Sequence, residues 1–246
     1  MECFCGFDPP APTESGTPFA PLVHNPLELK GFIVRAEALK IVGILVSVGC
    51  LSLPPASAAV PAMALTADAA ELLEGVARSR NNDGLPYMII DKRRAHLWVF
   101  DRAGRLQGDA PVLLGLARGD HTVPGIGDRE LSQIKPEERT TPAGRFLAEV
   151  GMNARGEDVV WVDYDAAVSM HRVLTTNPKE GRAQRLATST PDDNRVSFGC
   201  INVPKAFYEN VVNATVNGGN SIVYVLPESR PMHSVFGWLP AAVSMK

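Results

Sequence analysis

The chain has 246 residues, enough for one ordinary domain with a tail or for two small domains. Hydrophobic residues make up 45% and charged residues 21%, which predicts a packed core. The formal net charge is -3, from 24 basic and 27 acidic residues. This charge argues against a nucleic-acid-binding protein, which needs a broad basic face.

The first part of the chain is expected to lie outside the folded domain. Residues 1–33 are rich in proline, so we interpret them as disordered or as not part of the protein, with translation beginning near Val34. Residues 34–59 combine a basic flank, an apolar run at 41–53 and small residues at 56–58, the order of a secretory signal peptide. An uncleaved anchor helix is the alternative, although the run is short for a membrane span. The sequence therefore predicts an exported protein.

Cysteine usage narrows the chemistry. Cys3, Cys5 and Cys50 all precede residue 51, so Cys200 is the one cysteine beyond the leader. A lone cysteine forms no internal disulfide, and a zinc site built from several cysteines is excluded. Cys200 is then a buried small side chain, an intermolecular bridge or a reactive thiol.

Beyond the leader, the pattern predicts a mainly β domain. Residues 60–85 form a helical N-terminal segment, with a helix at 68–78. Short apolar runs separated by polar turns then predict a meander of antiparallel strands. These strands are expected at 87–90, 96–100, 112–115, 146–150, 159–162, 168–173 and 222–226. A helix is expected at 205–215, and residues 228–246 lack a pattern and are interpreted as a loose tail.

Two long polar segments interrupt the strands, at 117–139 and 174–194. Segments of this length in a compact domain are often functional. We interpret both as walls of a site.

The stretch 195–204 carries the strongest chemical signal. Gly199 lets the backbone approach a ligand or turn sharply, and Cys200 follows it directly before an expected helix. Backbone N–H groups and a helix N-terminus favour the thiolate there. His171 lies on an expected strand with Met170 on the opposite face, and histidine suits the base that a cysteine nucleophile needs. The residues alone leave a buried core cysteine and a hydrogen-bonded sheet histidine as alternatives.

Three motifs resemble the YkuD-type L,D-transpeptidases. Residues 197–202, Ser-Phe-Gly-Cys-Ile-Asn, resemble the family signature Ser/Thr-His-Gly-Cys-apolar-Asn/Arg. Met170-His171 resembles the upstream histidine motif, and residues 141–146 resemble the element Thr-Pro-x-Gly-x-Phe. The motifs occur in family order within residues 86–227. The resemblance implies a mainly β catalytic domain there, a sandwich or barrel-like fold with a few short helices.

The resemblance also implies roles. Cys200 would be the nucleophile and His171 its general base, with the backbone carbonyl of Arg172 orienting the imidazole. The N–H group of Gly199, with that of Cys200, would bind the oxyanion. The residues expected around the substrate are Ser197, Phe198, Asn202 and Arg195. A guanidinium fork suits a substrate carboxylate, although Arg195 pairing at the surface with Asp192 or Asp193 is an equal alternative.

The sequence departs from the family pattern in two places. Phe198 stands where the family usually has histidine, which removes a polar group beside the nucleophile. Residues 172 to 199 separate the histidine from the cysteine, a longer gap than is usual in the family. Segment 174–194 is therefore interpreted as a lid, a substrate-selective loop or a divergence.

Taken together, the resemblance implies a periplasmic or cell-envelope cysteine acyltransferase in a bacterium. Its partners would be peptidoglycan stem peptides, its inhibitors carbapenems, and it would need no metal or organic cofactor. One alternative is a catalytically idle peptidoglycan-binding module, which Phe198 favours and the pairing of His171 with Cys200 opposes. Another is an L,D-carboxypeptidase or other cysteine hydrolase.

Overall fold

The computed structural model describes residues 63–217 and 219–239. The expected extension at 1–33 and the expected signal peptide at 34–59 lie outside these residues. Within the described part, no helix combines the length and the apolar character that crossing a membrane requires.

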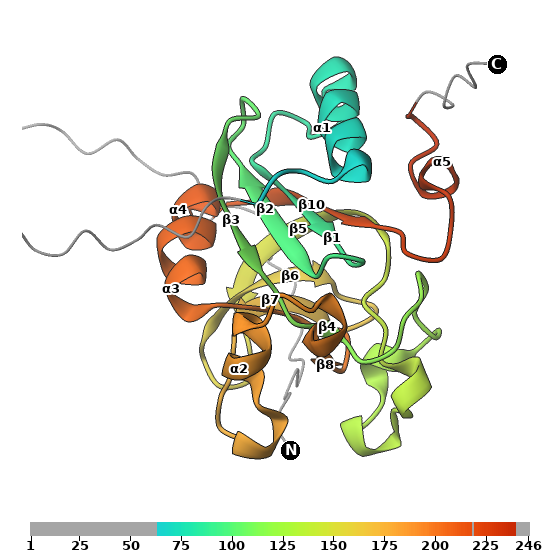
Figure 1. Ribbon diagram of the computed structural model, residues 1–246, viewed down its shortest axis with the longest axis vertical. Coiled ribbons are helices and arrows are strands. Elements are labelled where there is room, and N and C mark those ends of the chain that lie inside the picture. The colour runs from blue at the N-terminus through green and yellow to red at the C-terminus, as the bar shows by residue number, and fades with distance from the viewer. Residues whose placement is uncertain (1–62, 218, 240–246) are drawn as a thin grey trace, which may run out of the picture. The chain divides into compact units, whose positions relative to one another are not determined.

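An eight-stranded sheet forms most of the folded unit (Figure 1). Its strands, in spatial order, are β3 (Leu106–Pro111), β2 (His96–Phe100), β1 (Tyr87–Asp91), β10 (Ser221–Leu226), β5 (Gly144–Met152), β6 (Asp158–Asp163), β7 (Val168–Arg172) and β9 (Ile201–Val203). The pairs β1–β10 and β7–β9 are parallel, and the other neighbours are antiparallel. The short strands β4 (Leu114–Gly115) and β8 (Arg195–Ser197) form a separate parallel pair.

The two ends of the sheet nearly meet. Leu113, just after β3, exchanges two backbone hydrogen bonds of 2.9 Å with Asn202 on β9. The sheet therefore curls almost into a closed barrel, and the mainly β, barrel-like fold expected from the sequence is confirmed.

The larger hydrophobic core fills the inside of this curled sheet. Strand alternation sends Met88, Val99, Met170 and Ile201 inward, each fully buried. A continuous helical run packs against this core. It consists of α3 (Lys205–Phe207), a π-helical turn (Tyr208–Val212) and α4 (Asn213–Val216). Tyr208, Val212 and Val216 of this run join the core, and the run covers the helix expected at 205–215.

A second core covers the outer face of β1, β2 and β10. Helix α1 (Ala67–Ser79) packs there through Leu72 and Val76, and its N-cap is the Thr66 side chain, which accepts from the Ala69 N–H. The segment that we expected to be a loose tail contributes α5 (Met232–Val235) and the buried Phe236 to the same core. The expectation of a loose tail was wrong for the residues described up to 239. Phe236 and Leu239 are buried in the second core although apolar residues here follow no regular spacing.

Two further differences concern strands and turns. The third strand of the meander is β3, whose first residues are exposed, and the expected strand at 112–115 is reduced to the two residues of β4. The polar segments 117–139 and 174–194 contain short 3₁₀ turns, and the second also contains α2 (Arg182–Ala187). Figure 1 shows α2, β4 and β8 at the opposite end of the unit from α1 and α5.

Candidate active site

The register of β7 and β9 places the chemical residues on one face of the sheet. In this parallel pair, Met170 lies opposite Ile201, and His171 lies opposite Asn202. Met170 and Ile201 point into the core, so alternation turns His171 and Asn202 to the outer face. The prediction that His171 and Met170 lie on opposite faces is therefore confirmed.

Cys200 begins the same outer row. Its side chain is buried, with the residue 3% exposed, and its Sγ lies 3.6 Å from the carbonyl oxygen of Ala167 in the turn before β7. The hydroxyl of Ser169 lies 3.8 Å from the same sulfur. The thiol is thus held between the end of one turn and the start of β9, next to the outer face of β7.

The imidazole of His171 has a defined orientation. Its Nδ1 lies 2.8 Å from the carbonyl oxygen of Arg172. If Nδ1–H donates to that carbonyl, Nε2 is the nitrogen with a lone pair that can take a proton. The side chain of Arg172 lies on the other face of β7. Its Nη1 donates to Oδ1 of Asp158, and its guanidinium lies over the ring of Tyr208.

The turn that carries the cysteine depends on Gly199. Its φ is +137°, a conformation that side chains rarely adopt, and a Cβ there would stand 3.0 Å from the carbonyl oxygen of Thr140. The hydroxyl of Thr141 donates to the Gly199 carbonyl at 2.8 Å and accepts from the Gly115 N–H at 2.9 Å. The Thr-Pro motif and the cysteine motif are therefore joined through one buried hydroxyl.

Ser197 holds the turn from within. Its hydroxyl donates to the carbonyl of Cys200 at 2.6 Å and accepts from the N–H of Gly199 at 3.1 Å. The Gly199 N–H, which we expected to bind an oxyanion, is thus engaged inside the turn. Ser197 is fully buried, and both of these hydrogen bonds are to the backbone of this turn.

Asn202 also contacts the cysteine backbone. It is fully buried, and its amide donates to the Cys200 carbonyl at 3.3 Å. Its Oδ1 accepts from Nη1 of Arg182 at 2.5 Å. Arg182 belongs to α2 in the long segment 174–194, and sequence reasoning did not single it out. Its buried position became visible only once the fold brought α2 beside β9.

Arg195 has an internal partner. Its guanidinium is buried, donates to Oε2 of Glu228 at 2.6 Å and also donates to the carbonyl of Lys92 at 2.7 Å. The alternative of a surface pairing with Asp192 or Asp193 was wrong, because pairing of β8 with β4 carries Arg195 inward, where its guanidinium pairs with the Glu228 carboxylate. The role of Arg195 in binding a substrate carboxylate stays a prediction.

Behind the cysteine turn lies a buried ionic cluster. Lys92 bonds Asp120 at 2.8 Å and the carbonyl of Thr141 at 2.9 Å, and Glu228 lies 3.7 Å away. Burial lowers the pKa of Lys92, although the bond to Asp120 opposes this effect. Burial alone would raise the pKa of Asp120, but hydrogen bonds from Lys92 and Ser229 and from two backbone N–H groups hold it well below its usual range. The cluster ties Thr141, and through it Gly199, to the rest of the sheet.

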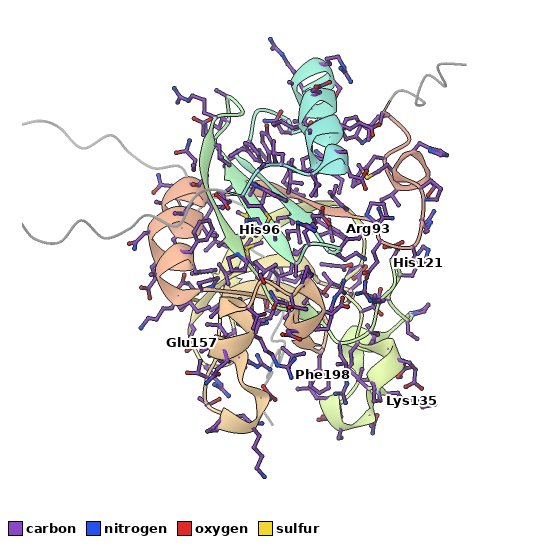
Figure 2. The ribbon with its side chains drawn as sticks, viewed as in Figure 1. Arg93, His96, His121, Lys135, Glu157 and Phe198 are labelled. Atoms are coloured by element: carbon purple, nitrogen blue, oxygen red, sulfur yellow. The ribbon has the colours of Figure 1, made fainter. Side chains whose placement is uncertain are left out.

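Phe198, the departure from the family pattern, is half-buried beside the cysteine. The guanidinium of Arg139 lies over its ring, 3.9 Å from the centroid. Arg139 ends the long polar segment 117–139, so that segment does reach the cysteine turn. Figure 2 shows Phe198 apart from His96 on β2, whose Nε2 lies 2.7 Å from Oδ2 of Asp109.

No cluster of three or more histidine, cysteine or acidic side chains suited to a metal ion occurs within 63–217 and 219–239.

Comparison with known proteins gives structural neighbours but no sequence match. No protein-family model and no curated protein matches the sequence. Among solved structures, the helical cell shape determining protein Pgp2 from Campylobacter jejuni has a TM-score of 0.41 at 14% identity, over 59% of this chain and 49% of that chain. The catalytic domain from the E. faecium L,D-transpeptidase has a TM-score of 0.32 at 18% identity, over 57% of this chain and 96% of that chain.

A third neighbour is the LD transpeptidase LdtMt1 in complex with imipenem, with a TM-score of 0.31 at 17% identity, over 57% of this chain and 58% of that chain. These structural neighbours are thus L,D-transpeptidase domains and a cell-shape protein, all at low identity. The chain spans about half the length of the Pgp2 chain.

Proposed function

We propose that the protein is a cysteine acyltransferase of the L,D-transpeptidase type that acts on peptidoglycan stem peptides. The observation that carries the proposal is the shared outer face of β7 and β9. His171 lies on β7 opposite Asn202, and Cys200, just before β9, has its sulfur 3.8 Å from the hydroxyl of Ser169 on β7. The contact between Nδ1 of His171 and the Arg172 carbonyl supports the same role, because it leaves Nε2 to exchange a proton.

The reaction would proceed in two halves. In the first, His171 takes the proton of the Cys200 thiol, and the sulfur attacks the acyl carbon of a donor stem. A C–S bond forms, the C–N bond to the terminal residue breaks, and the leaving amine takes the proton from His171. In the second half, an acceptor amine attacks the thioester and gives a proton to His171. A new C–N bond forms, the C–S bond breaks, and the thiolate takes the proton back from His171.

The tetrahedral intermediate of each half needs hydrogen-bond donors at its oxyanion. The family resemblance implies this role for the backbone N–H groups of Gly199 and Cys200, and in the structure the Gly199 N–H donates to the Ser197 hydroxyl. The buried hydrogen bonds that Thr141 and Ser197 make to the turn hold this backbone in place before substrate arrives.

We also propose that the enzyme works outside the cytoplasm, in the periplasm or cell envelope. The support is the order of basic flank, apolar run and small residues in residues 34–59, together with the location of its proposed substrate.

The direct test is acylation of the thiol. Incubation with a carbapenem followed by intact-mass spectrometry should show one added inhibitor mass on the wild type and none on Cys200→Ala. Peptide mapping should place the adduct on Cys200. A folded wild type with unchanged mass would contradict a standard L,D-transpeptidase site.

Purified muropeptides then separate the alternatives. A crosslinked product supports the transpeptidase, whereas a shortened stem without a crosslink identifies an L,D-carboxypeptidase. Binding without any product identifies an idle module. Full turnover by a folded Cys200→Ala variant would overturn the enzyme proposal altogether.

A further inference from the structure

The long segment between the histidine and the cysteine contacts β9 through a buried arginine. Arg182, in α2, has a side chain only 4% exposed. One nitrogen, Nη1, donates to Asn202 at 2.5 Å, and Nε donates to Oε2 of Glu180 at 2.5 Å. Burying a guanidinium costs free energy unless it is paired. The bonds to Asn202 and Glu180 therefore hold the Arg182 side chain in this position.

The hydrogen bonds of Arg182 connect it to Cys200 through Asn202. Asn202 accepts from Arg182 and donates to the carbonyl of Cys200, so the guanidinium, the amide and the cysteine backbone form one chain of hydrogen bonds. Asn202 also lies opposite His171 in the β7–β9 register. The fixed charge of Arg182 therefore stands over the same face as the thiol and the imidazole.

The distance is short on the scale of electrostatic interactions in a protein interior. Cys200 and Asn202 are two residues apart along the chain, which spans at most ~7 Å. A positive charge in contact with Asn202 thus lies on the order of 10 Å from the sulfur, where burial limits screening by salt. Such a charge favours the thiolate over the thiol.

We propose that Arg182 is a positioning residue through which segment 174–194 sets the reactivity of Cys200. It holds Asn202 against the cysteine backbone and supplies the positive charge that stabilises the thiolate. Glu180 opposes this charge and so limits the effect. The proposal deepens the proposed function and rests on it for its biological meaning, but thiol reactivity can be measured without any acyl substrate.

Other charges also bear on the thiol and must be kept constant in a test. Charged or titratable side chains on the elements around the cysteine turn include His171 on β7, Arg139 beside Phe198, Asp163 at the end of β6 and Asp165 in the turn before β7. The buried cluster behind the turn adds Lys92, Asp120 and Glu228, with Arg195 bonded to it. None of these is altered by substitutions at 180 or 182.

The experiment measures alkylation of Cys200 by iodoacetamide as a function of pH in the full chain. Peptide-resolved mass spectrometry separates Cys200 from Cys3, Cys5 and Cys50. Arg182→Met should slow alkylation at pH 7 about tenfold and move the midpoint of the pH profile up by about one unit. Glu180→Gln keeps an oxygen acceptor but removes the opposing charge, so it should move the midpoint to lower pH.

Opposite shifts are the signature of a charge effect, since a merely structural role would slow both variants without moving the midpoint. Lys179→Met is the matched control, because it removes an exposed positive charge from the same segment and should leave the profile unchanged. An unmoved midpoint in Arg182→Met overturns the proposal. If that variant fails to fold, Glu180→Gln decides alone, and an unmoved midpoint there overturns it.

The test is separable from that of the proposed function. Opposite shifts in alkylation without any carbapenem adduct or muropeptide product would retain the role of Arg182 and reject the acyltransferase. Acylation with unshifted profiles would do the reverse.

Discussion

His171 on β7 lies directly opposite Asn202 on β9, in the stretch where the two strands run parallel. This pairing brings β7, which carries His171, into contact with β9, which follows Cys200, although 28 residues, 172 to 199, separate the histidine from the cysteine. The relationship explains how a long intervening segment can leave the pairing of the two strands unchanged. The segment leaves from the end of β7 and returns at β8, so its length does not alter the register.

Loss of the imidazole should remove most of the activity without unfolding the protein. His171→Gln retains a side chain that can hydrogen-bond but cannot act as a base at neutral pH. We expect acylation of Cys200 to fall by roughly 10²- to 10⁴-fold, the usual contribution of a general base. Stopped-flow or mass-based acylation kinetics measure the loss, and circular dichroism checks the fold. Acylation within a factor of two of wild type would exclude His171 as the base.

Substitution of the turn glycine should destabilise the fold. In Gly199→Ala the new Cβ meets the Thr140 carbonyl at 3.0 Å while φ stays at +137°, so strain and crowding add. We expect the free energy of unfolding to fall by about 3 kcal/mol in urea denaturation. Gly156→Ala is the control: its φ is +74° but nothing lies within 4 Å, so it should lose only about 1 kcal/mol. Equal losses would show that the close approach at Gly199 is unimportant.

The buried ionic cluster should be sensitive to loss of one partner. Asp120→Asn leaves the ammonium of Lys92 in a buried site without its closest carboxylate, and such a change costs about 3–5 kcal/mol. Asp192→Asn, which alters an exposed partner of Arg118, should change stability by no more than about 0.5 kcal/mol. Urea denaturation at pH 7 compares the two. A similar small effect in both would mean that Glu228 alone compensates Lys92.

The same carboxylate predicts a dependence on acid. The pKa of Asp120 is held below its usual range in the folded protein, so its contribution to stability is present above the unfolded value and is lost as pH falls through the folded one. In Asp120→Asn, the decline of stability below about pH 4 should be shallower than in the wild type. Acid titration followed by tryptophan fluorescence measures this, and parallel declines would contradict it.

A second titration should appear closer to neutrality. Burial lowers the pKa of His96, although its contact with Asp109, 2.7 Å from Nε2 to Oδ2, opposes the shift. A lowered folded pKa means that stability is full above about pH 6.5 and declines as the pH falls toward the folded value. His96→Gln should therefore flatten the stability profile between about pH 5 and pH 7. Urea denaturation at several pH values compares His96→Gln with the wild type, and parallel profiles would contradict the prediction.

The parts of the fold that the sequence predicted share a clear local signal. Strands β1, β2 and β10 are short apolar runs between polar turns, and α1 has its apolar residues at helical spacing. Strand β3 has no such signal, since its first residues are exposed and pairing with β2 alone defines it. The burial of Lys92 could not be predicted from the sequence either, because its partner Asp120 lies far along the chain.

The site divides in the same way. Cys200, His171 and Thr141 were singled out through sequence motifs and strand alternation, both of which are local. Ser169 and Arg182 contact Cys200 or its neighbour Asn202 from positions that are remote in sequence, and each has an ordinary surface-like residue type. Only the curled sheet and the packing of α2 bring them together.

The near-closure of the sheet at Leu113 and Asn202 has a consequence for how the site can be assembled. Strand β9, which follows Cys200, is flanked on one side by β7 and on the other by Leu113, just before β4. A fragment that starts after β4 would retain every motif residue of the resemblance yet lack the two backbone hydrogen bonds between Leu113 and Asn202. Removal of the chain up to residue 115 should therefore lower the reactivity of the Cys200 thiol, although Cys200 itself is unchanged.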